Sequence, residues 1–237
     1  MICSSQEIHE LKGLNFMVPN CDKQYVLSRI NEVRDRAVKA SRIHILRVLE
    51  TNYFRFELLI LQDGSPLLSI STVRGTNNIN LRNLDMVKEL ADLTCCFSSK
   101  QDVMEKVKSY LGEARAGEAE VVDFEEKDAK VEFEPACDKV TFNEYREPEV
   151  KEGSSWATSE LAASENLYVK LLGGPAKFVS ISTERPQNSI KFGNADRLRS
   201  LCCFAALVWS KLSECKGLYD ALKELEAMAA TPKKRRK

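Results

Sequence analysis

The sequence predicts an α+β protein, built as a tandem duplication of a four-stranded antiparallel sheet followed by helix, with an acidic linker between the halves. Residues 68–90 recur at 179–201 at a fixed offset of 111, with ten identities in 23 aligned positions. Period-two alternation of apolar and polar residues marks several strands in each half, and a helical period follows the strands each time. These observations together indicate two similar halves.

The repeated stretch is sharpest at its start, where Leu-Ser-Ile-Ser-Thr-Val-Arg at 68–74 returns as Val-Ser-Ile-Ser-Thr-Glu-Arg at 179–185. Asn77 then aligns with Asn188, Asn83 with Asn194 and Leu90 with Leu201. Chance similarity between two amphipathic strand–helix pieces is the alternative to duplication. The duplication is favoured because it explains the whole order of elements.

The first half follows an N-terminal arm and helix at residues 1–41, the helix starting near Asp22. Residues 42–112 form the first predicted repeat. Its strands are expected at 42–50, 53–62, 66–74 and around Ile79 and Leu81, and Asp63-Gly64 is a hairpin turn signal. Asn83 is placed to cap a helix that reaches about residue 97, and a second helix is expected at 101–111.

The second half begins after a predicted acidic linker at 113–128. Residues 113–152 carry 14 acids and 6 bases. The second repeat spans 129–230. It is expected to begin with strand-like segments at 131–133 and 140–145, followed by a loop at 147–165 that is anchored by Trp156. Strands are expected around 167–171, 179–181 and 190–192. A helix capped by Asn194 and a final helix at about 218–228 complete the repeat.

Composition excludes several classes of protein. The chain is 43% hydrophobic and 30% charged, as in ordinary globular proteins, and lacks the run of about 20 apolar residues that a membrane span needs. Its start does not resemble a secretory signal. We therefore expect a nuclear and cytoplasmic protein that is not secreted and has no membrane partner.

Eight cysteines and two histidines offer little to a metal ion, because no C-x-x-C pair is present. Buried reduced thiols are the expected state of the cysteines. No nucleotide-binding glycine motif or nucleophile motif occurs, and His44 is expected to point outward from its strand. The sequence therefore predicts no enzyme activity, no metal and no cofactor.

The outward faces of the predicted sheets carry the candidate binding residues. Small polar side chains there would let a ligand approach, tyrosines can stack on bases, and basic side chains can neutralise phosphate. An ordinary solvated face is the alternative. The candidate nucleic-acid-binding residues are Tyr53, Arg55, Arg74, Asn80, Arg82, Tyr168, Lys170, Arg185 and Lys191.

The last five residues, Lys233, Lys234, Arg235, Arg236 and Lys237, form an unbroken basic cluster after Thr231-Pro232. Such clusters serve nuclear import or non-specific phosphate binding. The tail resembles a monopartite nuclear-localisation signal, although a solvated charged end would have the same composition.

Four antiparallel strands and a helix, duplicated in tandem, resemble the architecture of the Whirly and Pur-alpha families. The resemblance covers roughly residues 42–112 and 129–228 and lies in element order. The Whirly lysine-glycine-lysine motif has no counterpart, and the glycine-rich turns of Pur repeats are reduced to Asp63-Gly64 and Gly173-Gly174. The resemblance implies single-stranded DNA or RNA binding on the sheets, with helices packed together.

A protein–protein interaction module is the other function that the sequence allows. In that interpretation the apolar helices, with Cys202, Cys203, Phe204 and Trp209, form a homo-oligomer interface, and the acidic insert recruits a basic partner. Nucleic-acid binding would depend on salt and on the basic face residues, whereas an adaptor would respond to charge reversal in residues 118–134.

Overall fold

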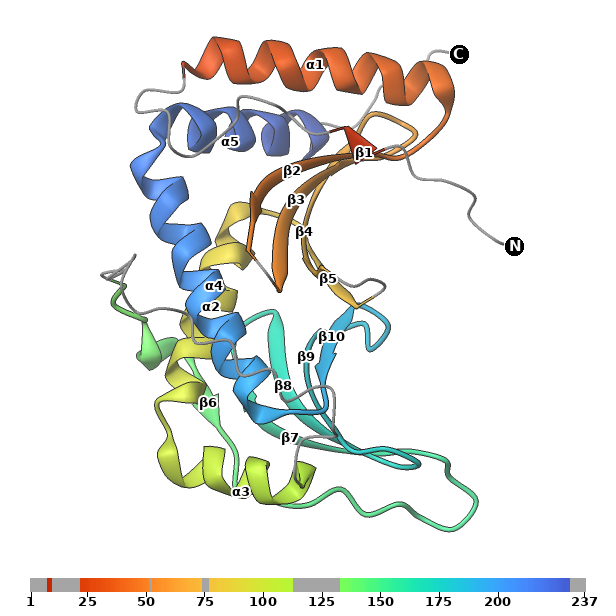
Figure 1. Ribbon diagram of the computed structural model, residues 1–237, viewed down its shortest axis with the longest axis vertical. Helices are drawn as coiled ribbons and strands as arrows, with labels where there is room; N and C mark the ends of the chain where they lie inside the picture. Colours follow the sequence, from red (N-terminus) through yellow and green to blue (C-terminus); the bar gives the residue numbers. More distant parts are fainter. Residues whose placement is uncertain (1–7, 10–21, 52, 74–76, 113–132, 231–237) are drawn as a thin grey trace. The chain divides into compact units, whose positions relative to one another are not determined.

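The computed structural model describes residues 8–9, 22–51, 53–73, 77–112 and 133–230. Within this part the chain forms five α-helices and ten β-strands, so the predicted α+β class is confirmed (Figure 1). The predicted acidic linker at 113–128, Arg74 and the basic tail lie outside the described residues.

The chain divides into two compact units, and neither is continuous in sequence. The first unit takes its described residues from 1–76, 80–84 and 211–237, and the second from 77–79 and 85–210. The final helix therefore belongs to the first unit, while the helices that follow the first group of strands belong almost entirely to the second.

Hydrogen bonding places the strands in one order, β1-β2-β3-β4-β5-β10-β9-β8-β7-β6. Among the strands of the described residues, only β1 and β2 pair in parallel, and the nine strands from β2 onward form an antiparallel sheet. The expectation of two separate four-stranded sheets is therefore wrong. The strands are β1 (Ile8–His9), β2 (His44–Glu50), β3 (Phe54–Ile60), β4 (Pro66–Thr72), β5 (Asn78–Leu81), β6 (Thr141–Phe142), β7 (Ala157–Ala163), β8 (Leu167–Gly173), β9 (Phe178–Thr183) and β10 (Ser189–Phe192).

The first unit packs β2–β4 against α1 (Lys23–Ala40) and α5 (Lys216–Ala230). Asp22 caps α1 by accepting a 3.1 Å hydrogen bond from the amide of Gln24, so the helix starts where the sequence predicted. Helices α1 and α5 lie side by side (Figure 1). Their apolar stripes and one face of the strands exclude water, which is the main stabilising term. The buried residues include Val26, Ile30, Val33, Phe54, Phe56, Leu58, Ile70, Leu218, Leu222 and Leu225.

The second unit packs β7–β10 with α3 (Gln101–Leu111) and with most of α2 (Leu84–Ser98) and α4 (Ala195–Glu214). The predicted cap of α4 is confirmed, since Asn194 Oδ1 accepts a 2.7 Å hydrogen bond from the amide of Asp196. The strands and helices share a fully buried core that includes Leu90, Val107, Val169, Leu171, Val179, Ile181, Leu198, Leu201, Ala205 and Val208.

Polar side chains of α2 tie that helix to distant parts of the second unit. Glu89 accepts hydrogen bonds from the Ser164 hydroxyl at 2.6 Å and from the amide of Asn166 at 2.5 Å, which fixes the β7–β8 turn. Asp92 accepts from the amide of Ala136 at 3.0 Å. The next turn of the helix carries Cys96, which forms a disulfide with Cys137. Residues on three successive turns of α2 thus bind it to other parts of the second unit.

Two sequence expectations in the second half are corrected. The segment predicted as a loop at 147–165 contains β7, which pairs with both β6 and β8. Its sequence, Ala-Thr-Ser-Glu-Leu-Ala-Ala, has too few β-branched and aromatic residues to predict a strand, so pairing partners decide its structure. The strand expected at 140–145 is limited to Thr141 and Phe142.

Two expectations about single side chains are also wrong. His44 lies directly opposite Ile60 and shares its face, which makes it an inward residue with only 3% of its surface exposed. Cys96 and Cys137 are joined in a disulfide, so the expectation of uniformly reduced thiols fails for this pair. Periodicity alone could not show which of two neighbouring strand residues faces a core.

Candidate nucleic-acid interface

The strand registers place the residues that were predicted to point outward on a common face in each unit, because residues directly opposite one another share a face. In the first unit Arg55 lies opposite Ser71 and Glu57 opposite Ser69. In the second unit Tyr168 lies opposite Ser182 and Lys170 opposite Ser180. We call these two surfaces the first and second polar faces.

Both units carry a register irregularity at the same place. In the first it falls between Arg47 and Leu49, at Val48, opposite the pair Phe56–Glu57. In the second it falls between Glu160 and Ala162, at Leu161, opposite the pair Val169–Lys170. Such bulges bend a strand and re-aim the side chains beside them. The matching irregularities make Glu57 and Lys170 structural equivalents.

Between β3 and β8 the equivalence differs by two residues from the offset of 111 that relates residues 68–90 to 179–201. Arg55 and Tyr168 occupy matching positions, as do Glu57 and Lys170, whereas the sequence offset pairs different residues. The hairpin between the matched pairs Leu58–Leu68 and Leu171–Val179 is two residues shorter in the second unit. An even shift preserves which face each side chain takes, so the outward assignment survives.

The first polar face is a network of opposite charges. Arg55 Nε lies 2.9 Å from Glu50 Oε1, and Arg47 Nη1 lies 3.1 Å from Glu50 Oε2. Glu57 is 4.0 Å from Arg47 and accepts a 3.1 Å hydrogen bond from the Ser71 hydroxyl. The sequence pattern did not predict that Arg47, Glu50 and Glu57 form an ion-pair network with Arg55. Only the strand register brings these side chains together. Two arginines and two glutamates leave this network neutral.

The second polar face has one such pair and more exposed cations. Lys170 Nζ lies 3.8 Å from Glu160 Oε2 and 4.5 Å from the centre of the Tyr168 ring. Lys191 on β10 and Arg185 after β9 are exposed. The amide and carbonyl of Lys191 are held by the Asn77 side chain at 2.9 and 2.6 Å, which fixes its backbone. Tyrosine and ammonium groups therefore lie together on a defined strand surface.

The serines of both faces lie beneath their larger neighbours. Ser69 is 1% exposed, Ser180 1% and Ser182 3%, so they form the floor between longer side chains. Among the remaining predicted residues, Tyr53 and Asn80 are half-buried and Arg82 is exposed. Arg74 and the tail residues Lys233, Lys234, Arg235, Arg236 and Lys237 lie outside the described residues.

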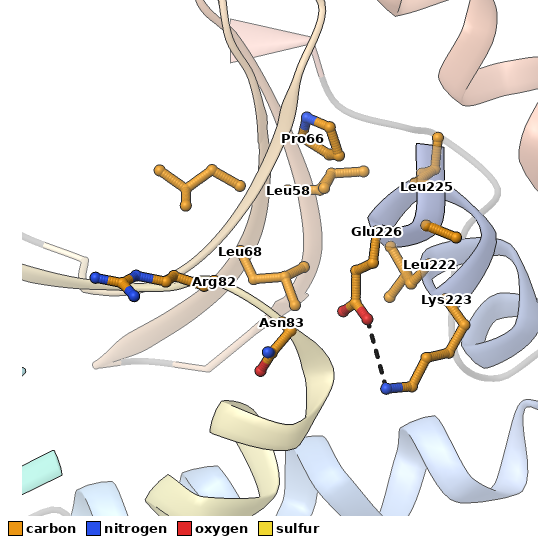
Figure 2. A pocket seen from close by; sticks show the side chains of 11 residues that line it. Leu58, Pro66, Leu68, Arg82, Asn83, Leu222, Lys223, Leu225 and Glu226 are labelled. Carbon is orange, nitrogen blue, oxygen red and sulfur yellow. Dashed lines mark ion pairs between the residues drawn. The ribbon is translucent and has the colours of Figure 1, made fainter. Parts of the chain in front are cut away.

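The first unit also contains a cavity of about 560 Å³. Most of its lining residues are apolar, unlike those of the polar faces. Leucines from β3, β4 and α5 line it, including Leu58, Leu68 and Leu222 (Figure 2). At its rim Glu226 is 3.5 Å from Lys223 and accepts a 2.6 Å hydrogen bond from the amide of Leu84. The carboxylate of the rim is thus used to hold the start of α2.

Comparisons with protein-family models, with curated proteins and with solved structures found no match for this chain. Among the helices that the structure describes, none has the length and apolar character needed to cross a membrane.

Proposed function

We propose that this protein is a non-enzymatic binder of single-stranded DNA or RNA, and that the second polar face is its main binding surface. The observation that carries the proposal is the grouping of Tyr168 and Lys170 on β8, with exposed Lys191 on the same sheet. An aromatic ring can stack on a base of any sequence, and ammonium groups beside it neutralise the backbone phosphates.

The chemistry of the second polar face suits such a ligand in a further way. Ser180 and Ser182 are almost fully buried and form the floor of this face, so Tyr168, Lys170 and Lys191 are the side chains that a strand of nucleic acid would meet. Lys170 is held by Glu160 at 3.8 Å, a contact that a phosphate can replace because partly exposed ion pairs contribute little.

The first polar face is proposed as a weaker site. Arg55 is paired with Glu50 at 2.9 Å, and Glu50 is also bound by Arg47. A phosphate there must compete with a carboxylate that already has two arginine partners. Binding at this face therefore gains less from counterion release.

The resemblance to the Whirly and Pur-alpha families is in keeping with this proposal. We further propose that the chain arose by tandem duplication, which the matching bulges at Val48 and Leu161 support beyond the sequence repeat. The basic tail is proposed as a nuclear-targeting signal for a protein of the nucleus and cytoplasm.

Fluorescence anisotropy with a labelled single-stranded oligonucleotide at two salt concentrations tests the proposed function. The full chain, a chain lacking residues 232–237, and the Lys170→Ala and Lys191→Ala variants are compared. We expect salt-sensitive binding that survives tail removal and weakens in both variants.

Lys106→Ala is the matched control. Lys106 on α3 lies 5.6 Å from the centre of the Tyr145 ring, so this change also removes one positive charge and one contact with a tyrosine ring. It should bind like the unaltered chain. Equal loss in Lys106→Ala and Lys170→Ala would contradict a defined surface. Absence of binding in every variant would remove the nucleic-acid proposal.

Self-association or recruitment of a protein partner is the second candidate. It is favoured by Trp156, a residue that is 47% exposed although its ring lies 6.4 Å from that of Phe178. Large apolar side chains left this accessible are common at protein interfaces. Sedimentation velocity over a hundredfold concentration range tests it, and Trp156→Ser should shift any oligomer towards monomer.

A further inference from the structure

Helices α2 and α4 of the second unit each carry two adjacent cysteines, Cys95-Cys96 and Cys202-Cys203. Cys96 is used in the disulfide with Cys137. Cys95 and Cys202 are free and half-buried, and their sulfur atoms lie 2.7 Å apart. Cys203 is also free and is exposed to solvent. Three free thiols on facing helices therefore lie beside an existing disulfide.

The distance between Cys95 and Cys202 is shorter than a thiol hydrogen bond normally requires, and it approaches the covalent value. A sulfur–sulfur bond is about 2.05 Å long. A movement of less than an ångström between the two side chains would join them. The helices thus already hold these two thiols at a separation from which a bond can form.

Cys203 differs from its neighbours in both exposure and acidity. The Cys202 thiol donates a hydrogen bond towards the Cys203 sulfur, which lowers the pKa of Cys203 to about 6. The same hydrogen bond, the contact with Cys95 and burial raise the pKa of Cys202. The lowered pKa of Cys203 favours the thiolate form of the exposed sulfur, and thiolates are the attacking species in disulfide exchange.

We propose that Cys203, Cys202 and Cys95 form a thiol–disulfide exchange site whose substrates are low-molecular-weight disulfides such as oxidised glutathione. The product is a second disulfide, between Cys95 and Cys202, that joins α2 to α4. This site is independent of the nucleic-acid surface.

The proposed reaction has three exchanges. The Cys203 thiolate attacks the small disulfide, forming a mixed disulfide and releasing one small thiolate. Cys202 then attacks the small-molecule sulfur of that mixed disulfide, which restores the Cys203 thiolate, and the proton of Cys202 passes to the released thiolate. Cys95 finally attacks Cys202 Sγ; the Cys95–Cys202 bond forms and the second small thiol leaves with the proton of Cys95. Two protein thiols are oxidised and one small disulfide is reduced to two thiols.

The test incubates the full chain with oxidised glutathione, blocks the remaining thiols with iodoacetamide, and maps the disulfides by mass spectrometry without reduction. Trypsin releases Cys95 in the peptide 89–100 and Cys202 in the peptide 200–211. We expect these peptides to become linked, with Cys203 alkylated, and fragmentation to assign the bond to Cys95 rather than Cys96. Recovery of both Cys95 and Cys202 as alkylated residues would overturn the proposal.

Variants separate the three roles. Cys203→Ser should slow the linkage by about tenfold, because the exposed thiolate is lost while the pair remains. Cys95→Ser should abolish the linkage and leave glutathione attached to Cys202 or Cys203. Cys215→Ser, which removes a buried free thiol of the first unit, is the control and should leave the rate unchanged.

The pH dependence gives a measurement that does not rely on variants. Alkylation of Cys203 in the unaltered chain should rise as the pH passes about 6, because the thiolate forms there. A linkage that persists in Cys95→Ser, or a Cys203→Ser variant that reacts at the full rate, would show that another pair or another first thiol is used.

Discussion

The two polar faces carry the same cross-strand ion pair with the signs exchanged. In the first unit Arg47 on β2 lies opposite Glu57 on β3, and in the second Glu160 on β7 lies opposite Lys170 on β8. Each pair stands beside an equivalent bulge. Opposite charges are favourable at directly opposed strand positions, and this holds whichever of the two strands carries the positive side chain.

The surroundings of the two pairs decide what each face can bind. Glu57 is largely buried and has a second partner in Ser71, so the first pair belongs to an internally satisfied network. Lys170 has one carboxylate partner and a tyrosine ring beside it. We therefore propose that the same backbone arrangement serves stability in the first unit and ligand binding in the second.

The largest expected effect comes from the two bulge residues. Leu161→Ala should lower the free energy of unfolding by about 3–5 kcal/mol, because Leu161 is 1% exposed and truncation leaves a cavity. Val48→Ala should cost about 2 kcal/mol because fewer methyl groups are removed. Urea unfolding followed by circular dichroism compares them. An equal or larger cost at Val48 would contradict the ranking.

Removing the Cys96–Cys137 disulfide should destabilise only the second unit. Replacing both residues with alanine should lower the free energy of unfolding by about 2–4 kcal/mol, since the bond closes a long loop in the unfolded chain. Both tryptophans, Trp156 and Trp209, lie in the second unit, so their fluorescence reports its unfolding. If the urea midpoint of the fluorescence transition did not change, the Cys96–Cys137 disulfide would contribute nothing to the stability of the second unit.

Affinity for single-stranded nucleic acid should depend on Lys170 more than on Arg55. Lys170→Ala should weaken binding about five- to tenfold, or roughly 1 kcal/mol, through loss of a phosphate contact. Arg55→Ala should change it less than about twofold, because Glu50 already neutralises that arginine. Anisotropy titrations at low salt measure both.

The same titrations include Glu160→Gln, which removes the competing carboxylate and should strengthen binding. Weaker binding in Glu160→Gln would indicate that the ion pair positions Lys170 for the ligand. Arg55→Ala with a loss as large as that of Lys170→Ala would place the main site on the first face.

The smallest effect is expected from the ion pairs themselves. Double-mutant cycles on Arg47–Glu57 and on Glu160–Lys170 should give coupling energies of about 0.2–1 kcal/mol. The larger value is expected for Arg47–Glu57, because its side chains are less exposed. Exchanging the signs in the second unit, with Glu160→Lys and Lys170→Glu together, should leave its stability within that range.

Much of the fold could be predicted because period-two and helical patterns report burial directly. The bounds of α1 and α3 and the inward residues of β3, β4, β9 and β10 follow from such patterns. β7 was missed because small residues give no strong pattern. The partners of Arg55 and Lys170 were missed because they depend on strand register and on bulges, which no periodicity encodes.

The cysteine cluster could not be predicted for a related reason. Cys95 and Cys202 are 107 residues apart, and only the packing of α2 against α4 brings their sulfur atoms together. Adjacent cysteines in helical sequence indicate only that one of each pair faces inward. The position of Cys137 beside Cys96 depends in turn on the segment that Asp92 anchors.

The discontinuous first unit has a consequence for synthesis on the ribosome. Helix α1 is made before the second unit, but α5, which packs against it, emerges only after the second unit. Until then the apolar stripe of α1, including Val26, Ile30 and Val33, lacks the helix that covers it in the native state. Domains usually fold as they are translated. The nascent first unit must instead wait until the second unit has been made, so the second unit has the earlier opportunity to fold.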